Sequence, residues 1–297
     1  MIAAPFPYFG GKRRAAPRIW QALGDPAGYI EPFAGSAAVL LARPTFTGRR
    51  VETLNDADGW LVNTWRAIQL SPAEVAQHAW GPVAEIDYHA RLAWLQQRRT
   101  PDLVAWMEGD PEAHDAKAAG WWLYVMACGI GDPFGPGPWR VVDGHLRKLP
   151  HLGDAGRGQL EAYMQQLADR LRRVRITCGS WQRVVKPSVT RSGTGGDGTR
   201  AIFLDPPYAT SGDLYAHVDA DVGLAVRDWC VTAPREMRVI LCGYDIEHDA
   251  LLAHGWTVTE GKASGGAGYS TNSANGRRER LWLSPACIGT TQPSLLP

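Results

Sequence analysis

Residues 1–70 alternate short β-prone runs with segments of helical spacing. Residues 28–33 and 50–54 are predicted to be strands, and residues 36–41 and 58–68 follow them with apolar side chains at helical intervals. A strand–helix–strand–helix order is typical of a parallel sheet covered by helices, because each crossover returns the chain to the same edge of the sheet. The sequence therefore predicts an α/β fold.

The sheet pattern returns near the end of the chain. Residues 174–178, 201–204 and 238–242 are β-prone, and residues 256–259 and 280–283 are expected to close the sheet as an antiparallel pair.

The middle of the chain has a different character. Its tryptophans and alanines recur at helical spacing, and a loop over residues 129–138 is rich in Gly and Pro. We expect a discontinuous domain of residues 1–70 and 171–284, a mainly helical insertion of residues 71–170, and a disordered tail of residues 285–297.

Composition limits the class of protein. The chain has 297 residues, of which 45% are hydrophobic, which excludes overall disorder. It contains no apolar run of membrane-spanning length and no secretory leader, so we expect a cytoplasmic protein without a membrane partner. The five cysteines form no ligand-like spacing, which favours reduced thiols and no metal. Although the net charge is only +1, residues 140–186 carry ten Lys and Arg against four acids.

The strongest chemical motif is Asp-Pro-Pro-Tyr at residues 205–208, directly after a predicted strand. Ligands of open α/β sheets bind beyond the carboxyl ends of strands. A carboxylate and a prolyl carbonyl in this rigid turn can accept both N–H protons of an exocyclic amine and so favour its attack, while an aromatic ring can stack on a base. A plain turn is the alternative. The candidate catalytic residues are Asp205, Pro206, Pro207 and Tyr208.

Two further motifs point to a nucleoside cofactor. Residues 31–36 form a strand-to-helix turn of small residues, and Asp56 ends the next strand at the distance at which carboxylates bind ribose hydroxyls. Residues 8–12 combine an aromatic pair, a Gly-Gly turn and a lysine that can meet a carboxylate. The candidate cofactor-binding residues are Tyr8, Gly11, Lys12, Glu31, Pro32, Phe33, Gly35, Ser36, Asp56 and Asp205.

Together, and in this order, these motifs resemble the Dam-like, or D12 class, adenine-N6 DNA methyltransferases, over roughly residues 5–70 and 174–283. The resemblance implies a Rossmann-like S-adenosylmethionine-dependent sheet with an inserted target-recognition domain, acting as a monomer on double-stranded DNA in a bacterial or phage-infected cell. It also implies S-adenosylmethionine as cofactor, Asp56 on its ribose, Phe33 near its adenine, and no metal. The family often has glycine where Ala37 stands here.

DNA contacts are predicted from composition alone, because the insertion matches no motif of the family. Basic and polar side chains beside the Gly/Pro loop and near the closing strands can meet phosphates and groove edges. Ordinary solvated or packed positions are the alternative. The candidates are Arg140, Arg147, Lys148, Asn272 and Arg277.

Two other functions stay open on sequence alone. Cytosine N4 and RNA adenine offer a similar amino group, so the same chemistry can serve a different acceptor. A catalytically silent DNA-binding homologue would keep the fold, but it would have no chemical reason to keep Asp205 and Tyr208.

Overall fold

The computed structural model describes residues 2–6, 12–81, 84–98, 102–110, 112–128, 157–190, 195–207, 222–260 and 278–289, with the backbone of 141–142 and 145–146. The chain divides into two compact units, one formed by residues 1, 12–55 and 180–297, the other by residues 2–11 and 56–179. Relative to the expected domains, residues 2–11, 56–70 and 171–179 group with the second unit.

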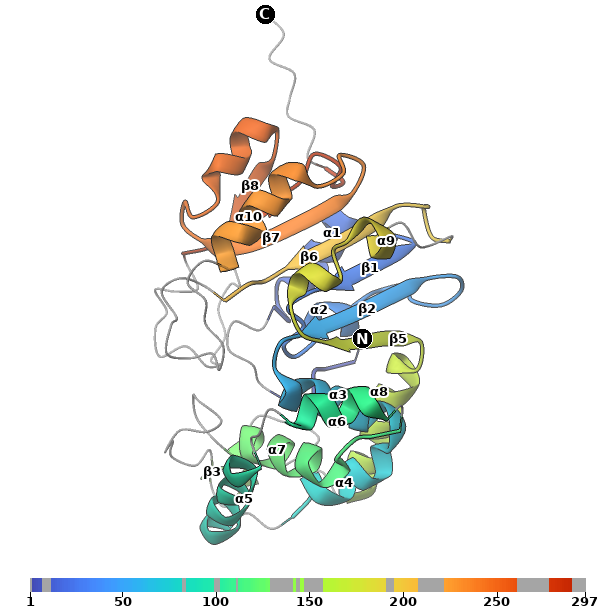
Figure 1. Ribbon diagram of the computed structural model, residues 1–297, viewed down its shortest axis with the longest axis vertical. Coiled ribbons are helices and arrows are strands. Elements are labelled where there is room, and N and C mark those ends of the chain that lie inside the picture. The colour runs from blue at the N-terminus through green and yellow to red at the C-terminus, as the bar shows by residue number, and fades with distance from the viewer. Residues whose placement is uncertain are drawn as a thin grey trace, which may run out of the picture. The chain divides into compact units, whose positions relative to one another are not determined.

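Seven strands form one sheet. In spatial order they are β5 (Val174–Cys178), β2 (Val51–Asp56), β1 (Gly28–Glu31), β6 (Arg200–Leu204), β7 (Arg238–Tyr244), β9 (Glu279–Leu283) and β8 (Thr257–Glu260). Strands β2, β1, β6 and β7 run parallel, whereas β9 is antiparallel to both β7 and β8 (Figure 1). The predicted α/β fold and its closing antiparallel pair are confirmed, and this arrangement is consistent with a methyltransferase fold.

Helices of the first unit pack on both faces of β1. Tyr29 points to the face of α1 (Ala16–Leu23), where its ring lies 4.6 Å from that of Trp20, and α2 (Ala38–Leu41) packs against α1. Ile30, the next residue, points to the opposite face and joins a buried cluster with Val226 of α10 (Val222–Thr232). This face also carries η1 (Trp181–Arg183), α9 (Pro187–Thr190) and η2 (Asp249–His254) (Figure 1). The alternation of a strand's side chains thus fills two cores.

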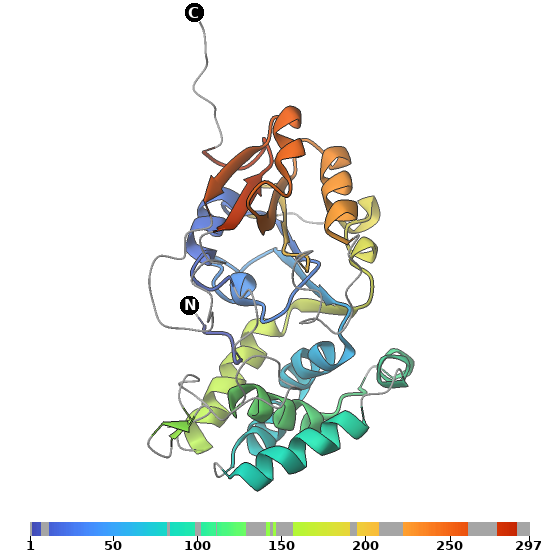
Figure 2. The same ribbon diagram turned by 90° about the vertical axis from the view of Figure 1, so that its left-hand side faces the viewer.

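The described part of the second unit consists mainly of helices (Figure 2). Its helices are α3 (Gly59–Leu70), α4 (Pro72–Ala79), α5 (Glu85–Gln97), α6 (Asp102–Gly109), α7 (Ala116–Cys128) and α8 (Arg157–Leu171), with a short hairpin of β3 (Val141–Val142) and β4 (His145–Leu146). Helices α4 and α7 pack so closely that a Cβ on Gly120 would lie 2.4 Å from the Cβ of His78. Among the described residues, no helix is both long and apolar enough to cross a bilayer.

The chain stays ordered past β9, which corrects the expected start of the tail. Cys287 is buried, and the Ile288 N–H donates to the Ala22 carbonyl at 2.8 Å. Residues 285–289 are therefore held against α1, because a buried thiol and a backbone hydrogen bond fix them there. Residues 290–297 of the predicted disordered segment lie outside the described residues.

Candidate active site

The ionisable side chains of the candidate site lie at one edge of the sheet. β1 ends at Glu31, β6 ends directly before Asp205, and β7 ends at Tyr244. Because β9 is antiparallel, its first residue, Glu279, lies at the same edge, paired with Tyr244. Parallel sheets bind ligands beyond this edge, so the strand directions bring the candidate residues together where the sequence predicts a site.

Lys12 and Asp205 form a buried ion pair at this edge. The Lys12 Nζ lies 2.8 Å from Asp205 Oδ2, and the lysine side chain is only 3% exposed. Lys12 is held by the chain that leads into α1, since its carbonyl accepts a hydrogen bond from the Ala16 N–H at 2.8 Å. The structure therefore brings Lys12 together with the first residue of the Asp-Pro-Pro turn.

The charge of Lys12 is strongly stabilised. Burial by itself disfavours an ammonium, but the negative charges of Asp205 and Glu279 and the hydrogen bond to Asp205 outweigh burial and raise the pKa of Lys12 well above its ordinary value. Lys12 is therefore an ammonium ion throughout the physiological range.

Asp205 keeps partial access to solvent. Its side chain is 19% exposed, in contrast to Lys12. The neighbouring Cys242, from β7, hydrogen-bonds to the Asp205 carboxylate, and burial raises the pKa of this thiol, which keeps it protonated and able to donate. Pro206 is buried and Pro207 partly buried. The carboxylate is thus held by protein donors on its inner side and still reachable from outside.

Glu31 lies beneath the turn rather than at its surface. The side chain is 2% exposed and accepts hydrogen bonds from the Tyr29 hydroxyl, at 2.8 Å, and from the backbone N–H of Leu40 in α2. Burial raises the pKa of Glu31 to about 8, although these two hydrogen bonds lower it. The negative charges of Glu52 and Asp205 add to the rise. Glu31 is therefore largely protonated at neutral pH and ties β1 to α2.

The turn at residues 32–37 is fixed by β2. Asn55 donates its side-chain amide to the Pro32 carbonyl at 3.0 Å, and its own carbonyl accepts the Ala34 N–H at 2.9 Å. Gly35 and Ala37 both adopt left-handed backbone conformations, with φ of 46° and 50°. Ala37 is strained by its Cβ in this conformation, whereas a glycine at this position would not be.

Two further turn residues lie beside the carboxyl edge. Ser36 is buried. The Phe33 ring is partly buried and packs 6.2 Å from the ring of Trp181. Phe33 is therefore packed against the core while part of it stays exposed.

Asp56 is the last residue of β2, two positions after Leu54, which pairs with Glu31. Its side chain is partly exposed, and its Oδ1 accepts the Asp58 N–H at 3.1 Å. Asp58 in turn caps α3 through the Trp60 N–H, at 2.9 Å. The carboxylate of Asp56 is thus oriented by the start of a helix and is partly open to solvent.

Several predicted residues lie outside the described residues, and their roles stay predictions. They are Tyr8, Gly11, Tyr208, Arg140, Arg147, Lys148, Asn272 and Arg277. Within the part of the chain that the structure describes, no cluster of His, Cys, Asp or Glu has the makings of a metal site, and all five cysteines are free thiols.

Three residues of the site were not predicted from the sequence. Glu279 and Cys242 contact the Lys12–Asp205 pair, and Tyr29 supports Glu31. A signal for Glu279 exists, because it begins a strand predicted to be antiparallel, and such a strand starts at the edge where parallel strands end.

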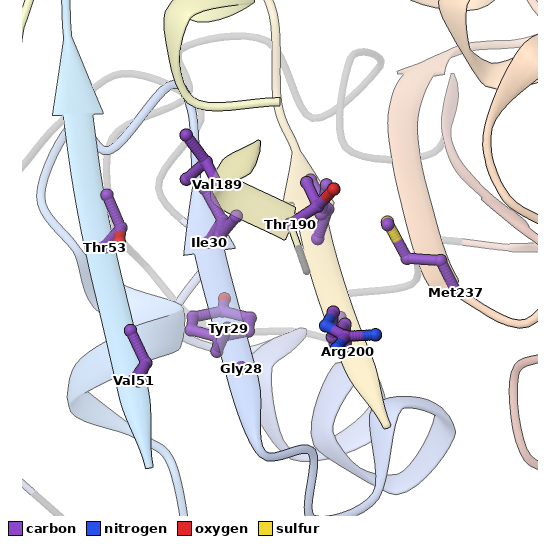
Figure 3. Close-up of a pocket in the computed structure, with 11 residues that line it drawn as sticks. Gly28, Tyr29, Ile30, Val51, Thr53, Val189, Thr190, Arg200 and Met237 are labelled. Carbon is purple, nitrogen blue, oxygen red and sulfur yellow. The ribbon is translucent and has the colours of Figure 1, made fainter. Parts of the chain in front are cut away.

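A small cavity lies elsewhere in the same unit (Figure 3). Side chains of β1, β2 and β6 line it from the sheet, and Val189 and Thr190 of α9 cover it. Its volume of about 10 Å³ admits no more than a single water molecule. The lining comes mainly from the amino-terminal halves of the strands, so this cavity is a packing defect and not a cofactor site.

Comparison with known proteins relates the first part of the chain to one enzyme family. The sequence model of the D12 class N6 adenine-specific DNA methyltransferase family matches residues 8–82. Over these residues the chain is similar to the D12 class N6 adenine-specific DNA methyltransferases. This confirms the resemblance that the motifs predicted, and it supports adenine-N6 DNA methylation as the activity of an adenine-specific DNA methyltransferase. No curated protein matches the chain.

The matched residues include Lys12, the turn at residues 31–36 and Asp56. The family acts on DNA and implies S-adenosylmethionine as the methyl donor. Asp205 lies beyond the match, but it is ion-paired to Lys12 within it.

Proposed function

We propose that this methyltransferase binds S-adenosylmethionine at the turn after β1 and transfers its methyl group to an adenine flipped out of double-stranded DNA at a specific sequence. The observation that carries the proposal is the 2.8 Å contact between Lys12 and Asp205, which links the matched cofactor region to the Asp-Pro-Pro turn. The helical unit is proposed to select the target sequence.

The proposed role of the chain's own residues is to position the adenine amine for attack. Asp205 and the Pro206 carbonyl accept the two N–H protons of the adenine amine, which directs the nitrogen lone pair at the methyl carbon. Two prolines hold both acceptors in place before the base arrives. When bound, S-adenosylmethionine supplies an electrophilic methyl group on a sulfonium ion. Adenine must leave the helix for its amine to reach this edge, because the target atom is inaccessible in the base stack.

The turn and Asp56 fit the proposed cofactor. The left-handed Gly35 and the small side chains around it allow a ligand to approach the backbone, and the partly exposed Asp56 carboxylate can accept hydrogen bonds from ribose hydroxyls. Phe33, held by Trp181, offers an apolar surface for the adenine ring.

The test is the product formed. The protein is incubated with unmodified DNA and methyl-labelled S-adenosylmethionine, and the nucleosides are then separated. Label in N6-methyladenine supports the proposal, and sequencing for modified bases gives the recognised site. Label in N4-methylcytosine, or transfer to RNA only, would show that cytosine or RNA adenine is the methyl acceptor instead. No label in any nucleic acid would contradict the proposal.

Replacing Asp56 tests the cofactor site. Asp56→Asn should raise the dissociation constant for S-adenosylmethionine by about tenfold or more, since it weakens charge-assisted hydrogen bonds to the ribose, while kcat at saturating cofactor changes little. Isothermal titration calorimetry and steady-state kinetics measure the two quantities. Asp58→Asn is the matched control, because asparagine caps a helix as well as aspartate and the dissociation constant should stay unchanged. A lower kcat with unchanged affinity would remove Asp56 from the cofactor site.

A further inference from the structure

Lys12 has a second carboxylate partner besides Asp205. Its Nζ lies 2.9 Å from Glu279 Oε1, nearly the same distance as from Asp205 Oδ2, and the Glu279 side chain is 16% exposed. The ammonium therefore lies between two carboxylates from opposite sides of β7.

The fold fixes this arrangement. Asp205 follows β6, and Glu279 begins β9, which pairs with β7 through the Tyr244–Glu279 register. β7 separates β6 from β9 in the sheet, so the two carboxylates converge from the strands on either side of β7. A lysine that reaches the edge from the segment before α1 can bridge both.

We propose that Glu279 is a positioning residue for methyl transfer, which holds the Lys12 ammonium so that Asp205 keeps its strength as an acceptor for the adenine amine. This inference rests on the proposed function. Glu279 acts through Lys12 and does not itself contact the substrate.

The reason is charge balance. A buried ammonium requires an anionic partner, and if Asp205 were its sole carboxylate partner, the pair would be neutral and the carboxylate would offer little negative potential to an incoming N–H. With Glu279 as second partner, the three groups carry a net charge of −1, and the ammonium can direct separate N–H donors at each carboxylate. Asp205 then remains anchored but electrostatically available.

A kinetic comparison tests the role of the charge. Glu279→Gln keeps the size and an oxygen acceptor but removes the charge, and it should lower kcat about tenfold while the dissociation constant for S-adenosylmethionine stays within about twofold. Glu279→Asp restores the charge and should recover part of the lost kcat. Glu236→Gln, the same change at an exposed position before β7, should behave like wild type. Wild-type kcat in Glu279→Gln overturns the inference.

A thermodynamic cycle tests the same coupling without turnover. Asp205→Asn and Glu279→Gln are made singly and together, and unfolding is measured by urea denaturation. The double variant should be destabilised by more than the sum of the single variants, because the ammonium then loses both carboxylates. In a Lys12→Met background this excess should vanish or change sign, since two neighbouring like charges repel.

The two experiments separate the inference from the proposed function. If wild-type protein forms no methylated nucleoside, the proposed function fails, whereas the cycle still reports whether Glu279 and Asp205 are coupled through Lys12. If wild type is active and the excess destabilisation persists in the Lys12→Met background, the inference alone is wrong.

Discussion

Asp205→Asn should lower kcat for DNA methylation by about a thousandfold, or roughly 4 kcal/mol of transition-state stabilisation. The amide has the same size as the carboxylate, but it carries no charge and one of its two polar ends is a donor. It therefore offers the adenine amine a weaker acceptor or a repulsive N–H contact. Quench-flow measurement of a single turnover at saturating cofactor isolates this step from product release.

The variant is expected to fold, because Lys12 keeps its 2.9 Å contact with Glu279 when the charge of Asp205 is removed. Cofactor affinity should therefore stay within about threefold of wild type. Asp197→Asn is the matched control, since Asp197 pairs with Arg238 at 2.5 Å, near the opposite ends of β6 and β7. Its kcat should equal that of wild type. Wild-type kcat in Asp205→Asn would show that the Asp205 carboxylate takes no part in the reaction.

The strands were predictable because a short run of apolar residues is a local signal for a strand that is covered on both faces. Ile202, Phe203 and Leu204 are apolar on both faces, as a strand covered on both sides must be, and the chain has helical spacing between such runs. β7 extends beyond its predicted end at Cys242, through Gly243. A Cβ at this position would lie 2.7 Å from the His248 ring, so this glycine makes room for packing and does not end the strand.

The candidate site was only partly predictable, for a physical reason. Asp205 and the residues 31–36 turn are local motifs whose place follows from the strand that precedes each of them. The contact of Lys12 with Glu279 instead depends on which strand lies beside β7 and in which register, and both are set by packing of the whole unit. The protonation of Glu31 likewise depends on its burial against Tyr29 and α2, which the motif alone does not encode.

Glu31→Gln should stabilise the cofactor-free protein at pH 8 by about 4 kcal/mol relative to wild type. The ordinary pKa of glutamate is 4.5, and burial raises that of Glu31 to about 8. Between these values the unfolded chain has released the proton and the folded chain retains it, so the folded state binds more protons and stability falls as the pH rises. Glutamine keeps the oxygen that accepts from Tyr29 and Leu40, but it has no proton to lose.

The measurement is urea denaturation of both proteins from pH 5 to pH 8. Wild type should lose stability relative to Glu31→Gln across this window, and the difference should be small at pH 5. Burial lowers the pKa of His248 to about 4, which makes the folded state less stable as the pH falls below about 6.5. This contribution is the same in both proteins and cancels in their difference.

Glu52→Gln is the matched control, and its expected effect on stability has the opposite sign. Glu52 is also buried, but it contacts the Arg43 guanidinium at 3.0 Å, so the same chemical change leaves a buried cation with a weaker partner. It should destabilise the protein at both pH values.

Parallel pH profiles for wild type and Glu31→Gln would show that Glu31 is ionised in the folded protein. Its carboxylate would then be a charged group of the site, as the cofactor-binding role predicted from the sequence requires, whereas a protonated Glu31 serves to hold the turn.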